Sequence, residues 1–595
     1  MLCSCFTRHK HTLRMFNTLF NRHIDLPKAD SLKKAVRTFS FTEKTIFWVL
    51  FAILSLSAIG ILLQVNSEFL VEVPDNGGSL TEGIIGSPRF VNPILAIGDA
   101  DKDLTSLVYS GLMRITPEGR VIPDLAESYS ISPDGLTYDF VLKDDIKFHD
   151  GSKITTDDIE FTIMKAQDPA IKSPRRASWD GVLMEKVNQK EIKFILKQAY
   201  TPFLSNTTIG ILPKKIWKNA NADEFAFSEY NTNPIGSGPY KVSSVKRNSA
   251  GIPNEYILKA FSGYALGKPH ITTLDLKFYQ NESDILTAYK NGDIESMNGI
   301  SGTVVADLEK NGAITMQAVL PRIFGVFFNQ NQAQIFTNKE VRQALDMALD
   351  KERIVKEVLS GYGTVARGPI PPLSITESEV SSSTTTPDRI AAAQKILTNA
   401  GWKYSTSTGV MEKKTKKNTV TLAFSISTSD APELKLAAQK IQEDWQKLGA
   451  KVDLQIFDTG DLNQNIIRPR KYDALFFGEI IGRDLDLYPF WHSSQRNDPG
   501  LNIAQYVNSK ADKALEQART TLDPEVRATK YADFTKEIEN DVPVVFVYSP
   551  SFTYILPSKV HGVRLGQITI PGERFLNVKD WYIETNKIWK IFNNS

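Results

Sequence analysis

Apolar side chains occupy every second position after a turn signal at 133–135, namely Leu136, Tyr138, Phe140 and Leu142. This period predicts a strand with one buried face. Ile146 and Phe148 predict a second strand, which the turn dipeptide Asp150-Gly151 ends. Thr155 and Asp158 have the spacing of a capping box, so a helix is expected to follow with Ile159 and Ile163 on one face.

In the C-terminal half, predicted strands alternate with predicted helices. Strands are predicted over 420–425 and 451–456, and an amphipathic helix over 434–448 lies between them. A strand, a helix and a strand in succession favour parallel α/β pairing. A helix over 531–540 and a buried strand over 543–548 follow. The second half of the chain is therefore predicted to be an α/β region.

The stretch from Thr45 to Ser67 contains no charged residue. About 20 helical residues at ~1.5 Å each cross a hydrocarbon core of ~30 Å, so this stretch predicts a transmembrane anchor. Trp48 lies near its start, where an interfacial aromatic residue is expected. Four basic residues lie just before the stretch, namely Lys33, Lys34, Arg37 and Lys44. The positive-inside rule places the N-terminus in the cytoplasm and the body outside; a cleaved signal peptide is the alternative.

Charge is distributed unevenly along the 595 residues. Residues 1–44 contain nine Lys and Arg against three Asp and Glu, a balance of +6, whereas the whole chain has +2. The remaining body is therefore mildly acidic at −4, which argues against a nucleic-acid-binding role. A chain of this length exceeds one hydrophobic core, so two or three lobes are expected. Both cysteines, Cys3 and Cys5, lie in the basic tail and are interpreted as reduced cytoplasmic thiols.

Several motifs at matching spacing resemble family 5 of the extracellular solute-binding proteins, the peptide-type receptors of ABC importers. They cover residues 88–93, 107–112, 123–128, 132–138, 148–151 with 155–158, and 233–242. The resemblance implies a large three-lobed α/β periplasmic-binding-protein fold, class II-like, here preceded by one transmembrane helix. It also implies a helix over 103–113 and reads the glycines at 236 and 238 as a tight turn before a strand.

Charge and hydropathy set off the tail, the anchor and the linker, and the resemblance divides the remaining body into three lobes. Residues 1–44 form a cytoplasmic tail, 45–67 the anchor and 68–79 a linker. Hinges are expected near 321–330 and 540–550. The lobes are lobe I over 80–112, 230–325 and 546–595, lobe II over 113–229, and lobe III over 326–545.

For the ligand site, the resemblance implies that a peptide main chain pairs with the segment 472–484 through Gly478 and Ile480. An acidic residue beyond it would bind the ligand's α-amino group by a charge-assisted contact. Strict spacing puts Gly482 at that position, so Asp484 is favoured, with Asp486 and Glu479 as alternatives. The motifs that border the cleft or the hinges supply the remaining expected contacts, namely Tyr109, Phe327, Asn329, Trp491 and Tyr548.

Motifs of known enzymes are missing from the sequence. It contains neither a Gly-x-Ser-x-Gly elbow nor a His-Glu-x-x-His pair. The histidines of the body are scattered, and His149 beside Asp150 lacks the three or four converging ligands of a zinc site. No enzyme activity, cofactor or resident metal is therefore predicted.

The predicted function is that of a plasma-membrane receptor with an extracytoplasmic binding body. It would capture a peptide by closure of its lobes and deliver it to the permease subunits of an ABC importer. Three alternatives remain open. One is a peptide-binding sensor or chaperone on the same fold, because fold does not fix function. Another is a receptor for a non-peptide solute such as a nickel complex, haem or a sugar. The third is a hydrolase acting outside the cell, which the missing nucleophile and metal patterns disfavour.

Overall fold

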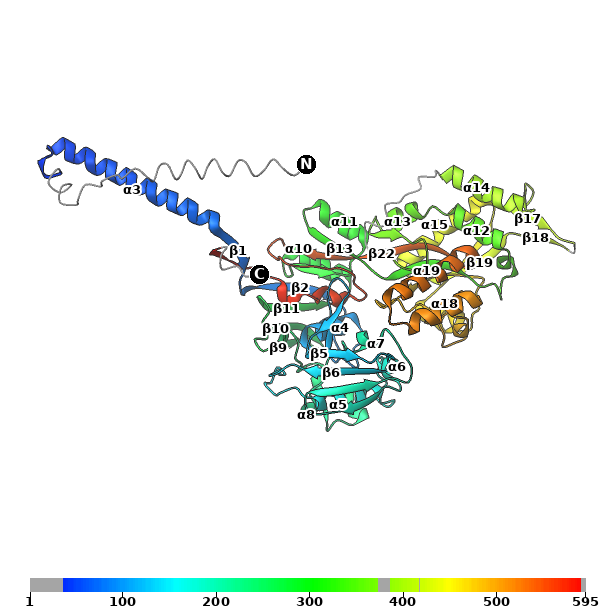
Figure 1. The fold of residues 1–595 in the computed structure, drawn as a ribbon. Coiled ribbons are helices and arrows are strands. Elements are labelled where there is room, and N and C mark those ends of the chain that lie inside the picture. Colours follow the sequence, from blue (N-terminus) through cyan, green and yellow to red (C-terminus); the bar gives the residue numbers. More distant parts are fainter. Residues whose placement is uncertain (1–35, 373–385, 417, 590–595) are drawn as a thin grey trace, which may run out of the picture. The chain divides into compact units, whose positions relative to one another are not determined.

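The computed structural model describes residues 36–372, 386–416 and 418–589 (Figure 1). The chain forms two compact units. One unit contains the N-terminal region up to Val73 together with the chain from Asn586 onward, and the other extends from Pro74 to Thr585. The last strand thus belongs with the N-terminal region and not with the body.

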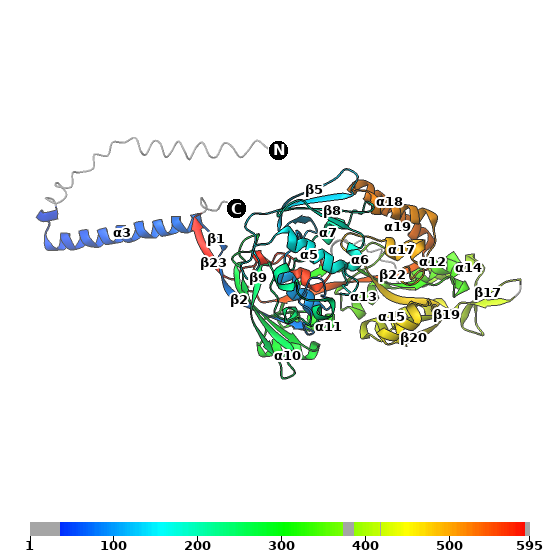
Figure 2. The same ribbon diagram turned by 90° about the horizontal axis from the view of Figure 1, so that it is seen from below.

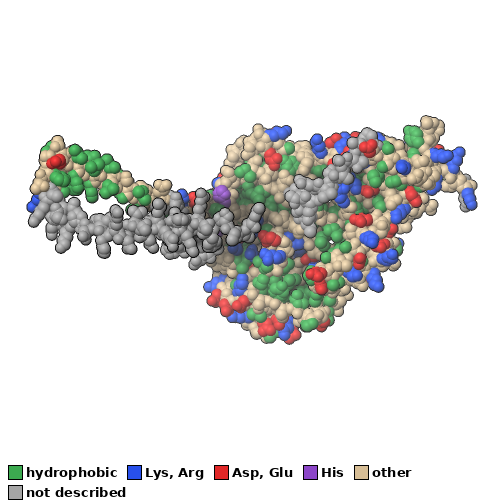
Figure 3. Space-filling model, turned by 45° about the horizontal axis from the view of Figure 1, so that its top comes forward, with side chains coloured by type: hydrophobic (Ala, Val, Ile, Leu, Met, Phe, Trp, Pro, Cys, Tyr) green, Lys and Arg blue, Asp and Glu red, His purple; other side chains and the backbone are tan. Residues whose placement is uncertain are grey.

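The first unit contains one long helix, α3 (Phe41–Phe69). The Ser40 side chain and Glu43 form its N-terminal capping box. The stretch Phe41–Gln64 has a mean hydropathy of 2.6, and none of it is buried by the described residues. Figure 3 shows its apolar side chains in green. The predicted helix over 45–67 is confirmed, and by length and composition it could cross a membrane.

A short two-stranded sheet follows the helix (Figure 2). Its strands are β1 (Leu70–Pro74) and β23 (Thr585–Trp589), from opposite ends of the sequence. The C-terminal strand therefore returns to the end of α3.

The body is organised around a twelve-stranded mixed sheet. Along the sheet the strands are β20 (Lys451–Phe457), β19 (Ala423–Ser429), β21 (Ala474–Ile480), β14 (Arg322–Phe328), β22 (Val544–Leu556), β12 (Ser296–Asn298), β2 (Gly77–Ile85), β11 (Ile271–Tyr279), β10 (Pro253–Ala260) and β9 (Tyr240–Arg247). Two more strands, β13 (Ile314–Val319) and β15 (Gly363–Val365), also pair with β22. The parallel pairing predicted between 420–425 and 451–456 is confirmed by β19 and β20.

Three smaller sheets complete the strands of the described body. They are β5 (Ala126–Ile131), β6 (Thr137–Leu142), β8 (Glu191–Ile195) and β7 (Leu183–Lys186); β3 (Met113–Ile115) with β4 (Val121–Pro123); and β16 (Lys403–Ser405), β17 (Val410–Lys414) and β18 (Thr419–Thr421). The alternation predicted for 136–142 is confirmed, because Tyr138, Phe140 and Leu142 of β6 are buried. The second predicted strand is wrong, since the region around Ile146 forms only an isolated bridge between Lys147 and Lys153.

The helices of the body cover these sheets. They are α4 (Asp99–Val108), α5 (Thr156–Gln167), α6 (Arg176–Trp179), α7 (Phe203–Asn206), α8 (Lys214–Trp217), α9 (Ala222–Phe225), α10 (Glu282–Asn291), α11 (Gly302–Lys310), α12 (Lys339–Ala348), α13 (Lys351–Val358), α14 (Thr386–Asn399), α15 (Pro432–Leu448), α16 (Thr459–Asp461), α17 (Tyr488–Trp491), α18 (Ser509–Thr520) and α19 (Pro524–Asp541). The capping box at Thr155 is present at the start of α5. The helix expected over 103–113 is wrong in its bounds, because Tyr109 is already extended.

Alternate residues of β14 and β22 point into two different hydrophobic cores. Val326, Phe328, Val545 and Val547 pack in one core together with Trp445 of α15. Phe327, Val544 and Phe546 pack in the other, together with Trp491 and Phe534. Successive strand residues face opposite sides of a sheet, so each face of this region is covered by its own helices. Separate cores around β6, around β2 and β11, and around α10 and α11 serve the rest of the body.

A fully buried arginine holds the C-terminal turn η6 (Pro571–Phe575) against the body. Its Nη2 lies 2.5 Å from Glu82 Oε1 and 2.7 Å from Asp103 Oδ2, so Arg574 joins β2 to α4. Glu82 also accepts a hydrogen bond of 2.6 Å from the Tyr554 hydroxyl of β22. Four chain regions therefore meet at one network of buried polar groups.

We expect Arg574→Met to lower the free energy of unfolding by about 3 kcal/mol or more, because two buried carboxylates lose their counter-charge. Urea denaturation of the detergent-solubilised chain, followed by tryptophan fluorescence, measures the change. Arg564→Met is the matched control. That arginine is exposed and pairs with Glu118 at 3.4 Å, a type of pair worth ~0–1 kcal/mol. Equal effects of the two substitutions would contradict the anchoring role of Arg574.

Candidate ligand pocket

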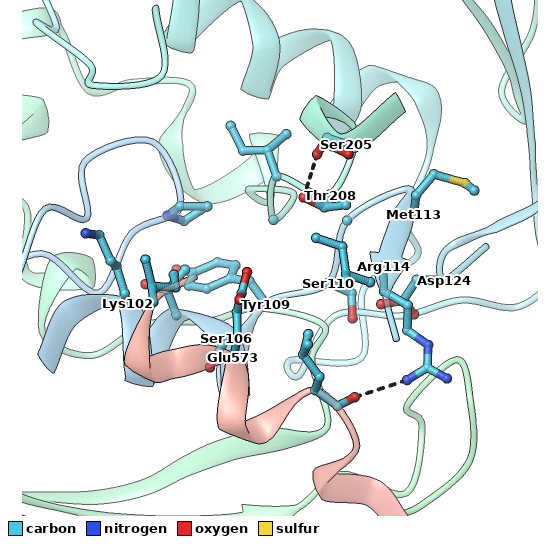
Figure 4. Close-up of a pocket in the computed structure, with 18 of the residues that line it drawn as sticks. Lys102, Ser106, Tyr109, Ser110, Met113, Arg114, Asp124, Ser205, Thr208 and Glu573 are labelled. Carbon is cyan, nitrogen blue, oxygen red and sulfur yellow. Dashed lines mark hydrogen bonds between the residues drawn. The ribbon is translucent and has the colours of Figure 1, made fainter. Parts of the chain in front are cut away.

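A pocket of about 580 Å³ lies where the end of α4 meets the α7 region and the C-terminal turn η6 (Figure 4). Its walls come from residues that are far apart in the sequence, at 93–115, 174–179, 205–210 and 569–579, together with Asp124, Pro239, Tyr264, Arg483 and Asp484. A volume in this range suits a small ligand.

Two close backbone approaches shape the wall beside α4. A Cβ atom at Gly236 would lie 2.1 Å from the carbonyl oxygen of Val108, and one at Gly238 would lie 2.6 Å from the Val108 carbonyl carbon. Only glycine permits this contact, in which the Gly238 N–H donates to the Val108 carbonyl at 2.8 Å. The turn predicted before the strand β9 is thus confirmed, and it supports the end of α4 directly before Tyr109.

The carboxyl group of Asp124 is buried in the pocket wall. The residue is only 4% exposed, and its Oδ1 finds no hydrogen-bond partner among the described residues. Burial raises the pKa of Asp124 to about 7, although the charges of Arg114 and Lys143 oppose the shift. The Tyr109 hydroxyl nearby is also buried without a partner in the described chain. The pocket therefore has polar groups whose hydrogen-bonding capacity is unused.

Cationic side chains also border the pocket. Lys102 of α4 lies at one side of the view in Figure 4, and Arg114 lies beside Asp124. The Arg114 Nη1 donates to the Leu576 carbonyl at 3.3 Å, drawn there as a dashed line. Arg175 contributes a further guanidinium. Both signs of charge are therefore available to a ligand.

The stretch after β21 connects distant parts of the body. Arg483 donates to Glu573 at 2.7 Å and to the Gln567 carbonyl at 2.6 Å. The next residue, Asp484, accepts a hydrogen bond of 2.8 Å from the Ser205 hydroxyl of α7. Burial raises the pKa of Asp484, and the Ser205 hydrogen bond opposes this shift. Two adjacent side chains thus attach this stretch to two opposite walls of the pocket.

A second connection lies beside the first. Asp486 pairs with Arg519 at 3.2 Å and accepts a hydrogen bond of 3.4 Å from the Tyr200 hydroxyl. The Arg519 guanidinium lies 5.2 Å from the centre of the Tyr200 ring and 4.7 Å from that of Tyr488. Burial is the main cause that raises the pKa of Asp486. The Oδ2 atom is therefore occupied by protein partners, whereas Oδ1 is buried without a hydrogen-bond partner among the described residues. Contact of Asp486 with a ligand stays a prediction.

Of the residues that the sequence nominates as ligand contacts, Tyr109 and Asp484 line this pocket. Ile480 is 57% exposed at the end of β21 and pairs with Arg322 across the sheet. A Cβ at Gly478 would lie 2.6 Å from the Phe324 ring, so this glycine permits ring packing. Contact of Gly478 and Ile480 with a ligand stays a prediction.

Glu479 points into the core that contains Trp491, and its Oε1 has no hydrogen-bond partner in the described chain. Burial raises the pKa of Glu479 well above its usual value, and the Trp491 indole opposes the shift only in part. Burial disfavours the charged form of this carboxyl, which is the form that would attract an ammonium group. The alternative role of Glu479 stays a prediction.

The remaining nominated residues are buried in the body. Phe327 and Trp491 pack against each other with ring centres 6.4 Å apart. Tyr548 donates to Glu433 at 3.0 Å and stacks on Phe324. Asn329 donates to the Arg470 carbonyl at 2.9 Å and orders a turn. Each has a packing role here, and a ligand role for them stays a prediction.

Several residues of the pocket were not predicted from the sequence. Asp124 and Ser110 lie within motifs that the resemblance covers, and each is a polar residue next to apolar neighbours. That pattern is the signal that could have identified them. Ser205, Arg483 and Glu573 carry no such local signal, because their importance comes from contacts between residues 279 and 90 positions apart in the sequence.

The His149 ring is partly buried and contacts a backbone carbonyl. Its Nε2 lies 3.1 Å from the Gly238 carbonyl, and burial lowers the pKa of His149 to about 4. Within residues 36–372, 386–416 and 418–589, no three His, Cys, Asp or Glu side chains converge as metal ligands.

A pocket assembled from separated stretches of a mixed α/β body is typical of proteins that enclose a small solute. The model of the bacterial extracellular solute-binding proteins, family 5, matches residues 120–501. The chain belongs to this family of solute-binding proteins. The resemblance stated from the sequence is thereby confirmed.

Individual relatives extend the match to most of the body. The oligopeptide-binding protein AppA of Bacillus subtilis is 30% identical over 519 residues, which cover 86% of this chain and 92% of AppA. Its structure with a bound nonapeptide has a TM-score of 0.63, with 29% identity, and covers 86% of this chain and all of that one. NikZ of Campylobacter jejuni, solved with Ni(L-His), has a TM-score of 0.65 and 28% identity over 85% of this chain and 99% of its own.

We expect Asp124→Asn to stabilise the body more at pH 8 than at pH 5. An unfolded aspartate titrates near ~3.9, so a folded pKa of about 7 means that the native state binds more protons between these values. The stability contributed by wild-type Asp124 therefore falls as pH rises through this window. Relative to the wild type, the asparagine variant should gain about 2 kcal/mol or more in free energy of unfolding at pH 8, measured by urea denaturation.

Asp134→Asn is the control with the opposite sign. Hydrogen bonds from Ser132 and from the Leu136 N–H lower the pKa of this exposed carboxylate, so its contribution is present at neutral pH and lost in acid. If Asp124→Asn shifted stability equally at pH 5 and pH 8, the burial argument would be contradicted.

Proposed function

We propose that this chain is a membrane-tethered receptor that binds a peptide in the pocket beside α4 and delivers it to an ABC permease. The observation that carries the proposal is the pocket itself, which is bordered by buried carboxylates and by cationic side chains. The similarity to AppA, whose structure contains a nonapeptide, supports peptide as the solute class. In this proposal the protein binds its ligand without altering it covalently.

The charges in the pocket match a zwitterionic ligand. Asp484 is the proposed partner of the ligand's α-amino group, because it lines the pocket and follows β21 closely. Arg114 and Lys102 are available for a carboxylate. Charge-assisted hydrogen bonds of this kind are about twice as strong as neutral ones.

Closure of the body around the ligand is part of the proposal. The bonds of Asp484 to Ser205 and of Arg483 to Glu573 cross the pocket, so they would form and break as it closes and opens. The proposed hinges lie in β14 and β22, which connect the two halves of the large sheet. The lobe boundaries given from the sequence are retained as part of this proposal.

A nickel–amino-acid complex is the second candidate solute. The similarity to NikZ, solved with Ni(L-His), favours it. Such a complex also has polar groups that could meet Asp124 and Tyr109. Binding assays with peptide mixtures and with nickel plus histidine separate the two candidates.

We further propose that α3 is an uncleaved anchor with the N-terminus in the cytoplasm. Its apolar stretch of 24 residues is longer than the core of a signal peptide. The basic tail before it supports this orientation.

We expect Asp484→Asn to weaken peptide binding about tenfold or more, because loss of a charge-assisted contact costs ~1.5–3 kcal/mol. Isothermal titration of the full chain in detergent with a peptide that stabilises it measures the change. Asp307→Asn, an exposed carboxylate on α11, is the control and should leave affinity unchanged. Unaltered affinity of Asp484→Asn would remove this residue from the proposed site.

Cysteine labelling tests the orientation, since Cys3 and Cys5 are the only cysteines of the chain. A membrane-impermeant maleimide should not label them in intact cells but should label them after permeabilisation. Ser407→Cys, in an exposed hairpin turn of the body, should be labelled in intact cells. Labelling of the tail cysteines in intact cells would contradict the orientation, and a purified chain lacking its first residues would indicate cleavage.

A further inference from the structure

Two aromatic side chains from opposite ends of the sequence stack at the end of α3. The rings of Phe69 and Trp589 have centres 6.3 Å apart and planes inclined by 16°. Both side chains remain exposed, Phe69 at 50% and Trp589 at 45%. The two aromatic side chains therefore cover each other only in part, and about half of each stays exposed among the described residues.

Strand pairing fixes this arrangement. The Lys587 ammonium lies 3.6 Å from the Glu72 carboxylate, two to three residues beyond the stacked pair on each strand. At the far end of β1, the Asp75 N–H donates to the Glu584 carbonyl at 2.9 Å. Residue numbers rise along one strand as they fall along the other, so β23 runs back along β1 toward α3. Trp589 is thus placed beside the end of the helix.

The spacing along α3 matches the thickness of a bilayer. Trp48 and Phe69 are 21 residues apart in one helix, which at ~1.5 Å per residue separates them by roughly 32 Å. The hydrocarbon core of a bilayer is ~30 Å thick. Trp48 is 58% exposed. When Trp48 lies at one interface, Phe69 and Trp589 lie at the other, where aromatic belts are enriched.

We propose that the stacked Phe69 and Trp589 side chains bind the outer headgroup region of the membrane and so attach the C-terminal strand to the lipid surface. This inference rests on the proposed anchor. The ligand is the lipid interface, whose mixed polarity suits an indole with an apolar body and one N–H donor. The consequence is that both ends of the body are held at the membrane.

Site-directed spin labelling of the full chain tests this proposal. The chain carries Cys3→Ser, Cys5→Ser and Ile588→Cys, so Trp589 is intact, and it is reconstituted in vesicles of phosphatidylcholine and phosphatidylglycerol. Power saturation compares access of oxygen and of a nickel chelate to the nitroxide. We expect the label at 588 to be at interfacial depth. A label at Thr585→Cys, about 10 Å farther along the strand, should report water.

Trp589→Ala should move the label at 588 from the interface into water, while Trp589→Tyr should retain the interfacial depth. Equal aqueous access at 588 and 585 in a full-length, vesicle-bound chain would overturn this proposal and leave the anchor intact. Low access of both reagents would also overturn it, since protein and not lipid would then cover the pair. A chain that has lost its N-terminal region and does not bind vesicles would instead contradict the proposed anchor.

Discussion

One strand, β22, holds the two halves of the body's sheet together. Its thirteen residues pair with β14 and β15 near the start and with β12 and β13 near the end. Its side chains alternate between two cores in the first part and enter further cores in the second. If a continuous strand slipped by one residue, every side chain would move to the other face of the sheet. The relative register of the two halves is therefore fixed by this pairing.

The pocket depends on polar contacts that connect distant segments of the body. Arg574 links Glu82 and Asp103, which keeps η6 against α4 and so maintains one wall. Arg483 and Asp484 join that wall and α7 to the end of β21. Buried charges are costly when unpaired, so the network favours one arrangement of these segments. The Asp124 carboxyl is buried with unused hydrogen-bonding capacity, which costs free energy. A ligand that donated a hydrogen bond to it would offset this cost.

Local features of the fold could be predicted from the sequence because their causes are local. The alternation in β6, the capping box of α5 and the glycine turn before β9 each depend on a few neighbouring residues. The error at Ile146 arose because two apolar positions do not specify a strand without a partner. At the site, Tyr109 is nominated by its motif and Asp484 as the first carboxylate after Gly482, the residue that strict spacing places there, whereas Ser205 and Glu573 depend on contacts between distant segments. Burial of Phe327 and Trp491 follows from tertiary packing, which alternation alone does not reveal.

The central claim, that the body encloses a peptide, is tested most directly by native mass spectrometry of the full chain purified in detergent. Denaturation then releases any bound molecule for identification. The account predicts a set of short peptides, together with a thermal shift when peptide mixtures are added to the stripped protein. A single non-peptide species, such as a nickel–amino-acid complex, or an empty protein that no peptide mixture stabilises, would contradict it.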